Sequence, residues 1–331
     1  MNYPEFHRNL GPFSLRQIAN HINADLKCSN DELLIDDFNG INSAKINDIT
    51  FLNDNFEVLD SSINVQTFIV SKNNKKINGS NKNILRVENV HLAVAKLSNL
   101  FFETHDNDYI KTLNAPDIKE NYKFLDDSAF IGNGVIIGKN AIINSGVHLG
   151  HNCTIGNNVT IDSNTVITNS IIGDNVTIGR NCSIGQPGFG FALNSPINEN
   201  IFHKGRVIIQ NNCQIGSNCC IDRGSFRDTV LGENTYMDNM CHIAHNVVIG
   251  NNCVFAACLG VAGSATIGNH VFTGGQVGIA GHITVGDRVK IAAQSGVFFS
   301  VGNDENLMGS PAINKFKYIK NFKMKNGRKI K

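Results

Sequence analysis

The sequence contains no run of eighteen apolar residues and therefore no candidate for a membrane-spanning helix. Its start, from Met1 to Glu5, lacks the basic and apolar character of a secretory signal. The formal net charge is only +1, so no overall field attracts nucleic acid or a membrane surface. These absences predict a cytoplasmic protein with no nucleic-acid partner and no integral membrane segment.

The sequence also lacks any CxxC pair, although it contains nine cysteines. Six of them fall four residues after a repeating aliphatic residue, at a place that valine fills in other repeats; they are Cys153, Cys182, Cys213, Cys219, Cys241 and Cys253. We interpret them as small buried hydrophobic residues with free thiols, and we predict no metal site.

An apolar or small residue recurs every six positions through much of the chain. The register is unbroken over twelve sites from 231 to 297, and it also runs through 131–167, 172–184 and 209–221. No helix can hold a period of six. Gly often follows the recurring residue and Asn or Asp is frequent just after it, which is turn chemistry because Gly and Asn tolerate positive φ. The pattern predicts short strands separated by sharp corners.

Such a pattern is typical of hexapeptide repeats and resembles the left-handed parallel β-helix of the hexapeptide acyltransferases. Three hexads make one triangular coil in that fold, so the twenty-five hexads predict about eight coils at a spacing of about 4.8 Å. We expect a mainly β protein with this β-helix over 116–311. A small α/β domain over 1–115 precedes it, and a basic extension over 312–331, expected to be helical, follows it.

The first 115 residues lack the repeat. Ser14 resembles an N-cap for a helical stripe from Leu15 to Ile22, and a second helix is expected from about 90 to 103. Phe51 and Phe56 stand with several amides near the end of an expected strand. They are either core residues or a stacking site for a planar base.

Two segments interrupt the repeat. The first, 186–206, carries Gly188-Phe189-Gly190-Phe191 and is either a binding loop on one wall or a disordered excursion; the Gly/Phe cluster favours the loop. The second, 222–228, is either a bulge or part of an interface groove. The 312–331 extension has eight Lys or Arg and no acid, which suits a solvated tail or an acidic protein partner.

The repeat predicts a candidate site, because residues eighteen apart stack directly in an eighteen-residue coil. Gly263 stands eighteen residues after His245, and His282 stands nineteen after Gly263, so we expect the three in one column. A bare glycine leaves its N–H approachable as an oxyanion donor. A neutral His245 could take a proton from an amine or hydroxyl that attacks an acyl group, with Asp238 as a candidate orienting carboxylate.

Other interpretations of these residues stay open. A single histidine on such a wall is often a surface polar residue, and Asp238 could simply occupy a turn. A zinc site with three histidines is the rival use. Gly263 stacks on His245, however, and His282 lies two coils away, too far to share an ion at ligand distances near 2.1 Å.

The segment Ile243 to Gly250, with Ile221-Asp222-Arg223-Gly224 before it and Gly281-His282 after it, closely resembles the UDP-3-O-acylglucosamine N-acyltransferase family of lipid A (lipopolysaccharide) biosynthesis. Gly188-Phe189-Gly190 and the segment ending in Phe51 match it too. The resemblance therefore covers both domains.

This resemblance implies an enzyme that is a homotrimer with active sites between adjacent β-helices. It implies a UDP-glucosamine-type acceptor bound by the N-terminal domain and an acyl carrier protein whose phosphopantetheine brings the acyl group, with no separate cofactor. His245 would be the general base on the 2-amino group, Asp238 its partner, and Gly263 the oxyanion donor. Four further residues would bind substrate: His282, Asn246, Phe51 and Phe189.

Three other functions remain as alternatives. A UDP-N-acetylglucosamine O-acyltransferase shares the coil but usually lacks an N-terminal uridine-binding domain, so the first 115 residues argue against it. A γ-type carbonic anhydrase and a non-catalytic β-helix scaffold belong to different classes. Gly296 sits where the resembled family can limit acyl length with a side chain.

Overall fold

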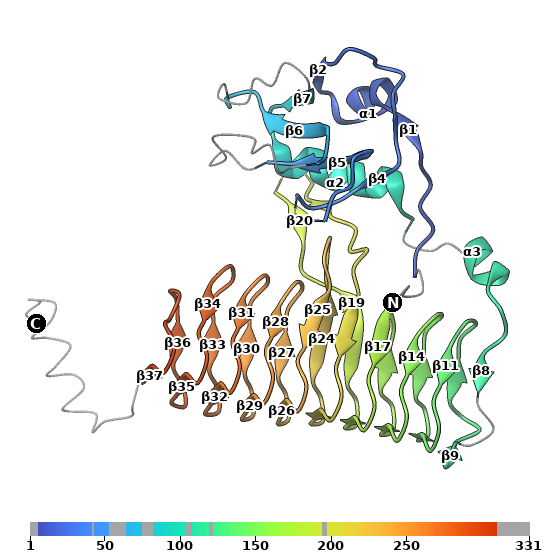
Figure 1. Ribbon diagram of the computed structural model, residues 1–331. Helices are drawn as coiled ribbons and strands as arrows, with labels where there is room; N and C mark the ends of the chain where they lie inside the picture. Colours follow the sequence, from blue (N-terminus) through green and yellow to red (C-terminus); the bar gives the residue numbers. More distant parts are fainter. Residues whose placement is uncertain are drawn as a thin grey trace, which may run out of the picture.

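The computed structural model describes residues 6–41, 43–52, 64–74, 82–103, 107–118, 122–193 and 197–309, and of 107–109 the backbone only. Phe56 and the 312–331 extension lie outside the described residues. A β-helix of three parallel sheets makes up most of the molecule, and a smaller α/β domain sits above its middle (Figure 1).

Each wall of the β-helix is one sheet, and each coil contributes one short strand to each wall. The first sheet comprises β8 (Asp117–Ile118), β11 (Ile136–Ile137), β14 (Thr154–Ile155), β17 (Ser170–Ile172), β22 (Val207–Ile209), β25 (Thr229–Leu231), β28 (Val248–Ile249), β31 (Thr266–Ile267) and β34 (Thr284–Val285). The second comprises β9 (Phe124–Leu125), β12 (Ile142–Ile143), β15 (Thr160–Ile161), β18 (Thr177–Ile178), β23 (Gln214–Ile215), β26 (Tyr236–Met237), β29 (Val254–Phe255), β32 (Phe272–Thr273), β35 (Lys290–Ile291) and β37 (Asn306–Leu307). The third comprises β10 (Phe130–Ile131), β13 (His148–Leu149), β16 (Val166–Ile167), β19 (Ser183–Pro187), β24 (Cys220–Arg223), β27 (His242–Ile243), β30 (Gly260–Val261), β33 (Gly278–Ile279) and β36 (Gly296–Val297).

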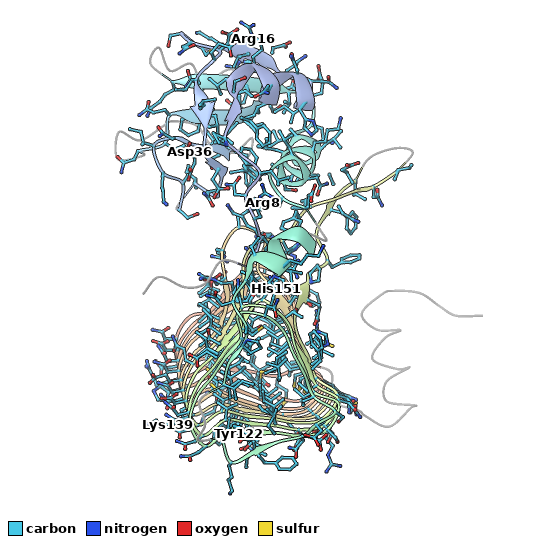
Figure 2. All side chains as sticks on the ribbon, turned by 90° about the vertical axis from the view of Figure 1, so that its right-hand side faces the viewer. Arg8, Arg16, Asp36, Tyr122, Lys139 and His151 are labelled. Carbon is cyan, nitrogen blue, oxygen red and sulfur yellow. The ribbon has the colours of Figure 1, made fainter. Side chains whose placement is uncertain are left out.

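The predicted left-handed β-helix of hexapeptide repeats is confirmed, with the recurring residues inside. Ile249, for example, pairs in register with Leu231 and Ile267, and all three are at most 1% exposed. The six cysteines predicted to be buried are buried free thiols. Figure 2 shows side chains filling the triangular interior. The walls hold nine or ten strands rather than eight, because β8, β9 and β37 extend the stack beyond the clear hexads.

Many of the corners place an asparagine in the left-handed conformation. Asn158 and Asn252 adopt the left-handed conformation, with φ of 56° and 59°. Glycines that directly follow the recurring residue serve another purpose: a Cβ on Gly138 would lie 2.6 Å from backbone atoms of Gly156 in the next coil. Close stacking of the coils, rather than positive φ, therefore requires glycine at that position.

The N-terminal domain is a five-stranded sheet in the order β2 (Asp25–Lys27), β7 (Asn83–Val87), β6 (Thr67–Ser71), β5 (Asp48–Phe51) and β4 (Asp37–Phe38), with β1 (Phe13–Ser14) paired to β3 (Leu34–Ile35). Two helices, α1 (Leu15–Ile22) and α2 (Val90–Phe101), pack their apolar faces on it, and α3 (Asn107–Thr112) lies in the linker. Ser14 caps α1 through a capping box with Gln17, as the sequence predicts.

The segment 186–206 leaves the β-helix as a hairpin, in which β20 (Phe191–Ala192) pairs antiparallel with β21 (Glu199–Asn200). The hairpin reaches α2, where Asn99 Nδ2 donates to the carbonyl of Asn200 at 3.0 Å. The described residues of this segment therefore form a structured hairpin on one wall rather than a disordered excursion.

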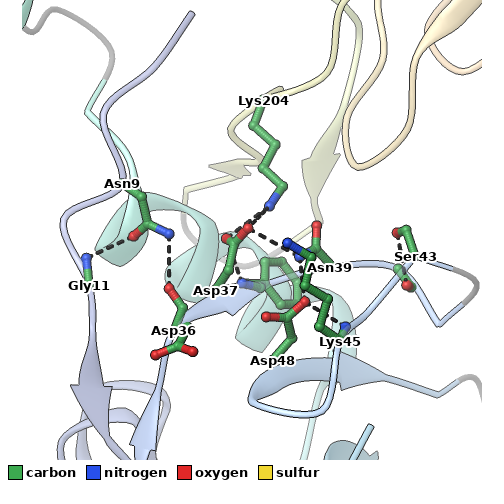
Figure 3. Close-up of polar contacts among 11 residues, drawn as sticks. Asn9, Gly11, Asp36, Asp37, Asn39, Ser43, Lys45, Asp48 and Lys204 are labelled. Atoms are coloured by element: carbon green, nitrogen blue, oxygen red, sulfur yellow. Dashed lines mark hydrogen bonds and ion pairs between the residues drawn. The ribbon is translucent and has the colours of Figure 1, made fainter. Parts of the chain in front are cut away.

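Several contacts tie the N-terminal domain to the β-helix. The ring of Phe226 packs edge-on against Phe38, with centroids 4.8 Å apart. Lys204 Nζ donates to both carboxylate oxygens of Asp37, at 2.8 and 2.7 Å (Figure 3). Phe202 lies in the core of the N-terminal domain and stacks on Phe102 at 5.3 Å. Both interruptions of the repeat thus form the interface between the two domains.

Candidate active site

His245 follows β27 at a corner of the third sheet, and its ring lies between two glycines. A Cβ on Gly263, one coil away, would lie 2.7 Å from both Cε1 and Nε2 of the ring. A Cβ on Gly188 would lie 2.6 Å from the Cβ of His245. Any side chain at either glycine would displace the imidazole, so both positions require glycine for close approach rather than for conformation.

The hydrogen bonds around His245 determine its tautomer. The backbone N–H of Ser225 donates to Asn246 Oδ1 at 2.9 Å, so that atom must be the amide oxygen. The same oxygen lies 3.0 Å from His245 Nδ1. Nδ1 therefore carries the hydrogen of the neutral ring, and Nε2 presents its lone pair beside Gly263. Arg227 and Thr229 hold the Asn246 backbone in place.

The structure brings His245 and Gly263 together as predicted, but His282 is displaced from their column by one residue. The register pairs His242 with Gly260 and Gly260 with Gly278, so Gly281 continues the column of His245 and Gly263. His282 instead takes the left-handed corner position, with φ of 60°. The reason is the coil length: a spacing of nineteen residues ends one position beyond an eighteen-residue repeat.

Asp238 follows β26 and therefore belongs to the second wall, away from His245 in the same chain. Its Oδ1 accepts from the backbone and side-chain nitrogens of Asn239, at 2.7 and 2.8 Å. It lines a separate hollow with Tyr236 and Phe272. Within one chain, the described residues contain no hydrogen bond between Asp238 and His245.

A different carboxylate, Asp222, lies on the wall of His245. It is 5% exposed, its Oδ1 accepts from Gln186 Nε2 at 2.8 Å, and its Oδ2 lies 3.7 Å from His242 Nε2. Burial raises the pKa of Asp222, while the nearby His242 and His245 and the bond from Gln186 oppose that rise. Asp222 belongs to the motif Ile221-Asp222-Arg223-Gly224, but its spacing in the sequence does not indicate a role in the site.

A second histidine, His203, lies beside His245 and carried no prediction. The two rings are 5.3 Å apart between centroids and nearly perpendicular, at 78°. His203 is 2% exposed, and burial lowers its pKa to about 4, with further lowering by His245 and Arg223. One sequence signal is its place in the 186–206 interruption, which lacks a repeat to give it a register.

An apolar groove of about 530 Å³ extends from His245 along the third wall. Its floor is a track of glycines eighteen residues apart; an added Cβ on Gly260 or Gly278 would meet nothing within 4 Å. Phe189 stands at its rim, 84% exposed and edge-on to Phe191. The lining residues are Phe189, His242, Ala244, His245, Gly260, Val261, Ala262, Gly263, Gly278, Ile279, Ala280, Gly296, Val297 and Phe298. The groove suits a long apolar chain.

A second hollow, of about 560 Å³, lies between the two domains and is lined by Lys204, Arg206 and Arg227 among others. Phe51 is half-buried nearby, with its ring 5.7 Å from that of Phe226. Phe51 thus takes part in the domain interface and does not line the groove beside His245.

Three family models match parts of the chain: the GMPPB C-terminal domain over 118–202, the bacterial transferase hexapeptide (six repeats) over 228–263, and the hexapeptide repeat of succinyl-transferase over 264–297. The three parallel sheets that form the walls, together with these matches, define the class of protein. The chain is a hexapeptide-repeat protein with a left-handed parallel β-helix.

Within that class the chain resembles UDP-3-O-acylglucosamine N-acyltransferases. The one from Caulobacter vibrioides is 47% identical over 75 residues, which are 23% of this chain and 22% of that relative. The one from Parvibaculum lavamentivorans is 50% identical over 62 residues, 19% of this chain and 18% of that relative. Each match thus spans about a fifth of the relative's length.

A solved UDP-N-acetylglucosamine acyltransferase from Bacteroides fragilis has a TM-score of 0.51 and 25% identity to this chain, covering 55% of this chain and 70% of that one. In the described parts of the chain, no helix is long and apolar enough to span a membrane. The same parts contain no group of three His, Cys, Asp or Glu side chains that could hold a metal ion.

A pH dependence of stability follows from the buried His7. Its Nε2 accepts from Asn169 Nδ2 at 2.8 Å, and burial, aided by Arg223 and His151, lowers its pKa to about 3. Between pH 6.5 and pH 3 the unfolded chain binds a proton here and the folded chain does not, so stability falls as pH falls through this window.

We expect His7→Gln, which keeps an acceptor for Asn169, to reduce the loss of unfolding free energy between pH 6.5 and pH 4.5 by up to roughly 2–3 kcal/mol. Urea denaturation at several pH values measures this difference. His91→Gln, at an exposed position on α2, is the matched control and should leave the slope unchanged. Equal slopes for wild type and His7→Gln would contradict the assignment.

Proposed function

We propose that this chain is an acyltransferase that moves a 3-hydroxyacyl group from acyl carrier protein to the 2-amino group of UDP-3-O-(3-hydroxyacyl)glucosamine, in lipid A biosynthesis. The named relatives support the reaction type. The observation that carries the proposal is the His245 imidazole, whose bare Nε2 faces Gly263 at one end of the apolar groove. We propose a cytoplasmic location for this reaction.

The geometry suits a general-base mechanism. The 2-amino nitrogen attacks the thioester carbonyl while His245 Nε2 takes its proton, and a C–N bond forms. The developing oxyanion accepts from the Gly263 N–H, which no backbone acceptor among the described residues takes. The intermediate collapses with cleavage of the C–S bond, and the thiolate leaves with the proton that His245 gives up. The Asn246 bond stabilises the protonated imidazole throughout.

The groove suits the acyl chain, because its glycine floor is apolar and free of side chains. The donor's phosphopantetheine brings that chain, so we propose no separate cofactor. Phe189 at the rim would close over the chain. Gly296 ends the glycine track beside Phe298, and a side chain there would shorten the space.

The remaining assignments concern the acceptor and the assembly. We propose that the N-terminal domain binds the uridine, with Phe51 near it, and that His282 and Asn246 contact the sugar or phosphates. Asp238 lies on another wall, so it could serve His245 only from a neighbouring copy. This placement supports a homotrimer with active sites between adjacent β-helices.

The alternative acceptor is UDP-N-acetylglucosamine, which an O-acyltransferase would acylate on a hydroxyl group. The similarity in fold to the UDP-N-acetylglucosamine acyltransferase from Bacteroides fragilis supports this alternative. The assay therefore offers the purified chain a 3-hydroxyacyl carrier protein with either the free-amine acceptor or UDP-N-acetylglucosamine. We expect product only from the free amine, detected by mass spectrometry. Acylation of UDP-N-acetylglucosamine alone would overturn the proposal.

We expect His245→Ala to abolish turnover, with a loss of about 10³-fold or more, because the amine then has no base. Nucleotide binding, measured by calorimetry, and the oligomeric state, measured by light scattering, should persist. A variant that keeps near-wild-type activity would show that His245 is not the base.

We expect Gly278→Met to block the groove without disturbing the fold, because an added Cβ there meets nothing within 4 Å. Turnover with long-chain donors should fall by about tenfold or more relative to short-chain donors, since the chain loses its apolar contacts. Gly302→Met is the matched control, because it is equally open and lies outside the groove. If both variants keep the wild-type chain-length preference, the groove does not hold the acyl group.

A further inference from the structure

His203 is held as a neutral ring against His245. Its Nδ1 lies 2.9 Å from the carbonyl oxygen of Ile201, so Nδ1 carries the hydrogen and donates it. Its Nε2 is buried and has no hydrogen-bond partner. An apolar side chain could fill the same space without burying an unpaired nitrogen, so packing alone gives no reason for an imidazole here.

The hairpin covers both imidazoles through Gly188 and Gly190. A Cβ on Gly190 would lie 2.5 Å from Cε1 of His203, just as one on Gly188 would collide with His245. The Gly190 N–H donates to the Gly188 carbonyl at 3.0 Å, which fixes the distance between the two contacts. The relative placement of the two rings is thus set by one tight turn.

Arg223 fixes the backbone that carries His203. Its Nε donates to the His203 carbonyl at 2.7 Å, and its Nη1 donates to the Gly185 carbonyl at 3.1 Å. Arg223 is 7% exposed, and its guanidinium joins the two ends of the hairpin at the wall. A protonated His203 would lie beside this cation, so the neutral ring is the form that the site accommodates.

The residues on either side of His203 face the other way, into the N-terminal domain. The Phe202 N–H donates to Ser98 Oγ at 2.9 Å, and its ring is part of the domain core. Lys204 pairs with Asp37 and lies 5.0 Å above the Phe102 ring. Because Phe202 and Lys204 on either side are anchored in the N-terminal domain, the side chain of His203 between them is held toward His245.

We propose that His203 is a positioning residue, which holds the His245 ring in its productive orientation and ties that orientation to the docked N-terminal domain. The inference deepens the proposed acyl transfer and rests on it. His203 itself touches no substrate, because its ring is covered by Gly190 and the hairpin.

The test measures kcat and KM for the full-length wild type, His203→Ala and His203→Asn in the acyl-transfer assay. We expect His203→Ala to lower kcat by roughly ten- to a hundredfold, with KM for the acceptor unchanged, because the base is misplaced and no substrate contact is lost. His203→Asn places an amide N–H where Nδ1 lay, keeps the bond to Ile201, and should recover much of kcat. Melting temperatures show whether each variant is folded.

A double-variant cycle with Lys204→Met tests the link to the N-terminal domain. If Lys204 acts by aiming His203, the single variant Lys204→Met should lower kcat. The double variant should then have the same kcat as His203→Ala. If the kcat losses of the two single variants instead multiply in the double variant, Lys204 does not act through His203.

A His203→Ala variant that is folded and keeps wild-type kcat, or that loses only acceptor affinity, would overturn the positioning role while leaving the proposed function intact. An inactive wild type would overturn the proposed function itself and this inference with it.

Discussion

Backbone hydrogen bonding between successive coils is the interaction on which the rest of the structure depends. Each short strand pairs in parallel register with the strands above and below it, so equivalent residues stack directly. Glycines that follow the recurring aliphatic permit this close approach, since a Cβ on Gly138 would collide with the next coil. The stacking turns a linear repeat into columns, and two of these columns build the site: His245 over Gly263, and the glycine floor of the groove.

The two interruptions of the repeat supply what a regular coil cannot. A coil corner exposes His245 to solvent on one side, and the hairpin covers that side through Gly188. The 222–228 segment provides the Ser225 N–H that orients Asn246, and through it the tautomer of His245. The same segment carries Phe226 to the N-terminal domain. The regular coils therefore determine the spacing between His245 and Gly263. The two interruptions determine the orientation of the His245 ring and the contact with the N-terminal domain.

Electrostatics around the site combine buried neutral rings with a buried cation. Burial lowers the pKa of His7 to about 3, of His203 to about 4 and of Arg223 to about 10. Two uncharged imidazoles can pack near the guanidinium, whereas two charged ones would repel it and each other. Asp222 is the carboxylate on this wall, and Gln186 and the histidines near it compensate part of the cost of its burial.

The sequence by itself determined the β-helix, the buried cysteines and the pairing of His245 with Gly263, because a six-residue period in an eighteen-residue coil is a local rule that holds wherever it is unbroken. It failed by one residue at His282, since column membership changes completely with a shift of one position. Only the tertiary structure brought Asp222, Ser225 and His203 to the site. Those three lie at or within breaks in the repeat, where no period gives a register, and their positions follow from packing against the N-terminal domain and the hairpin.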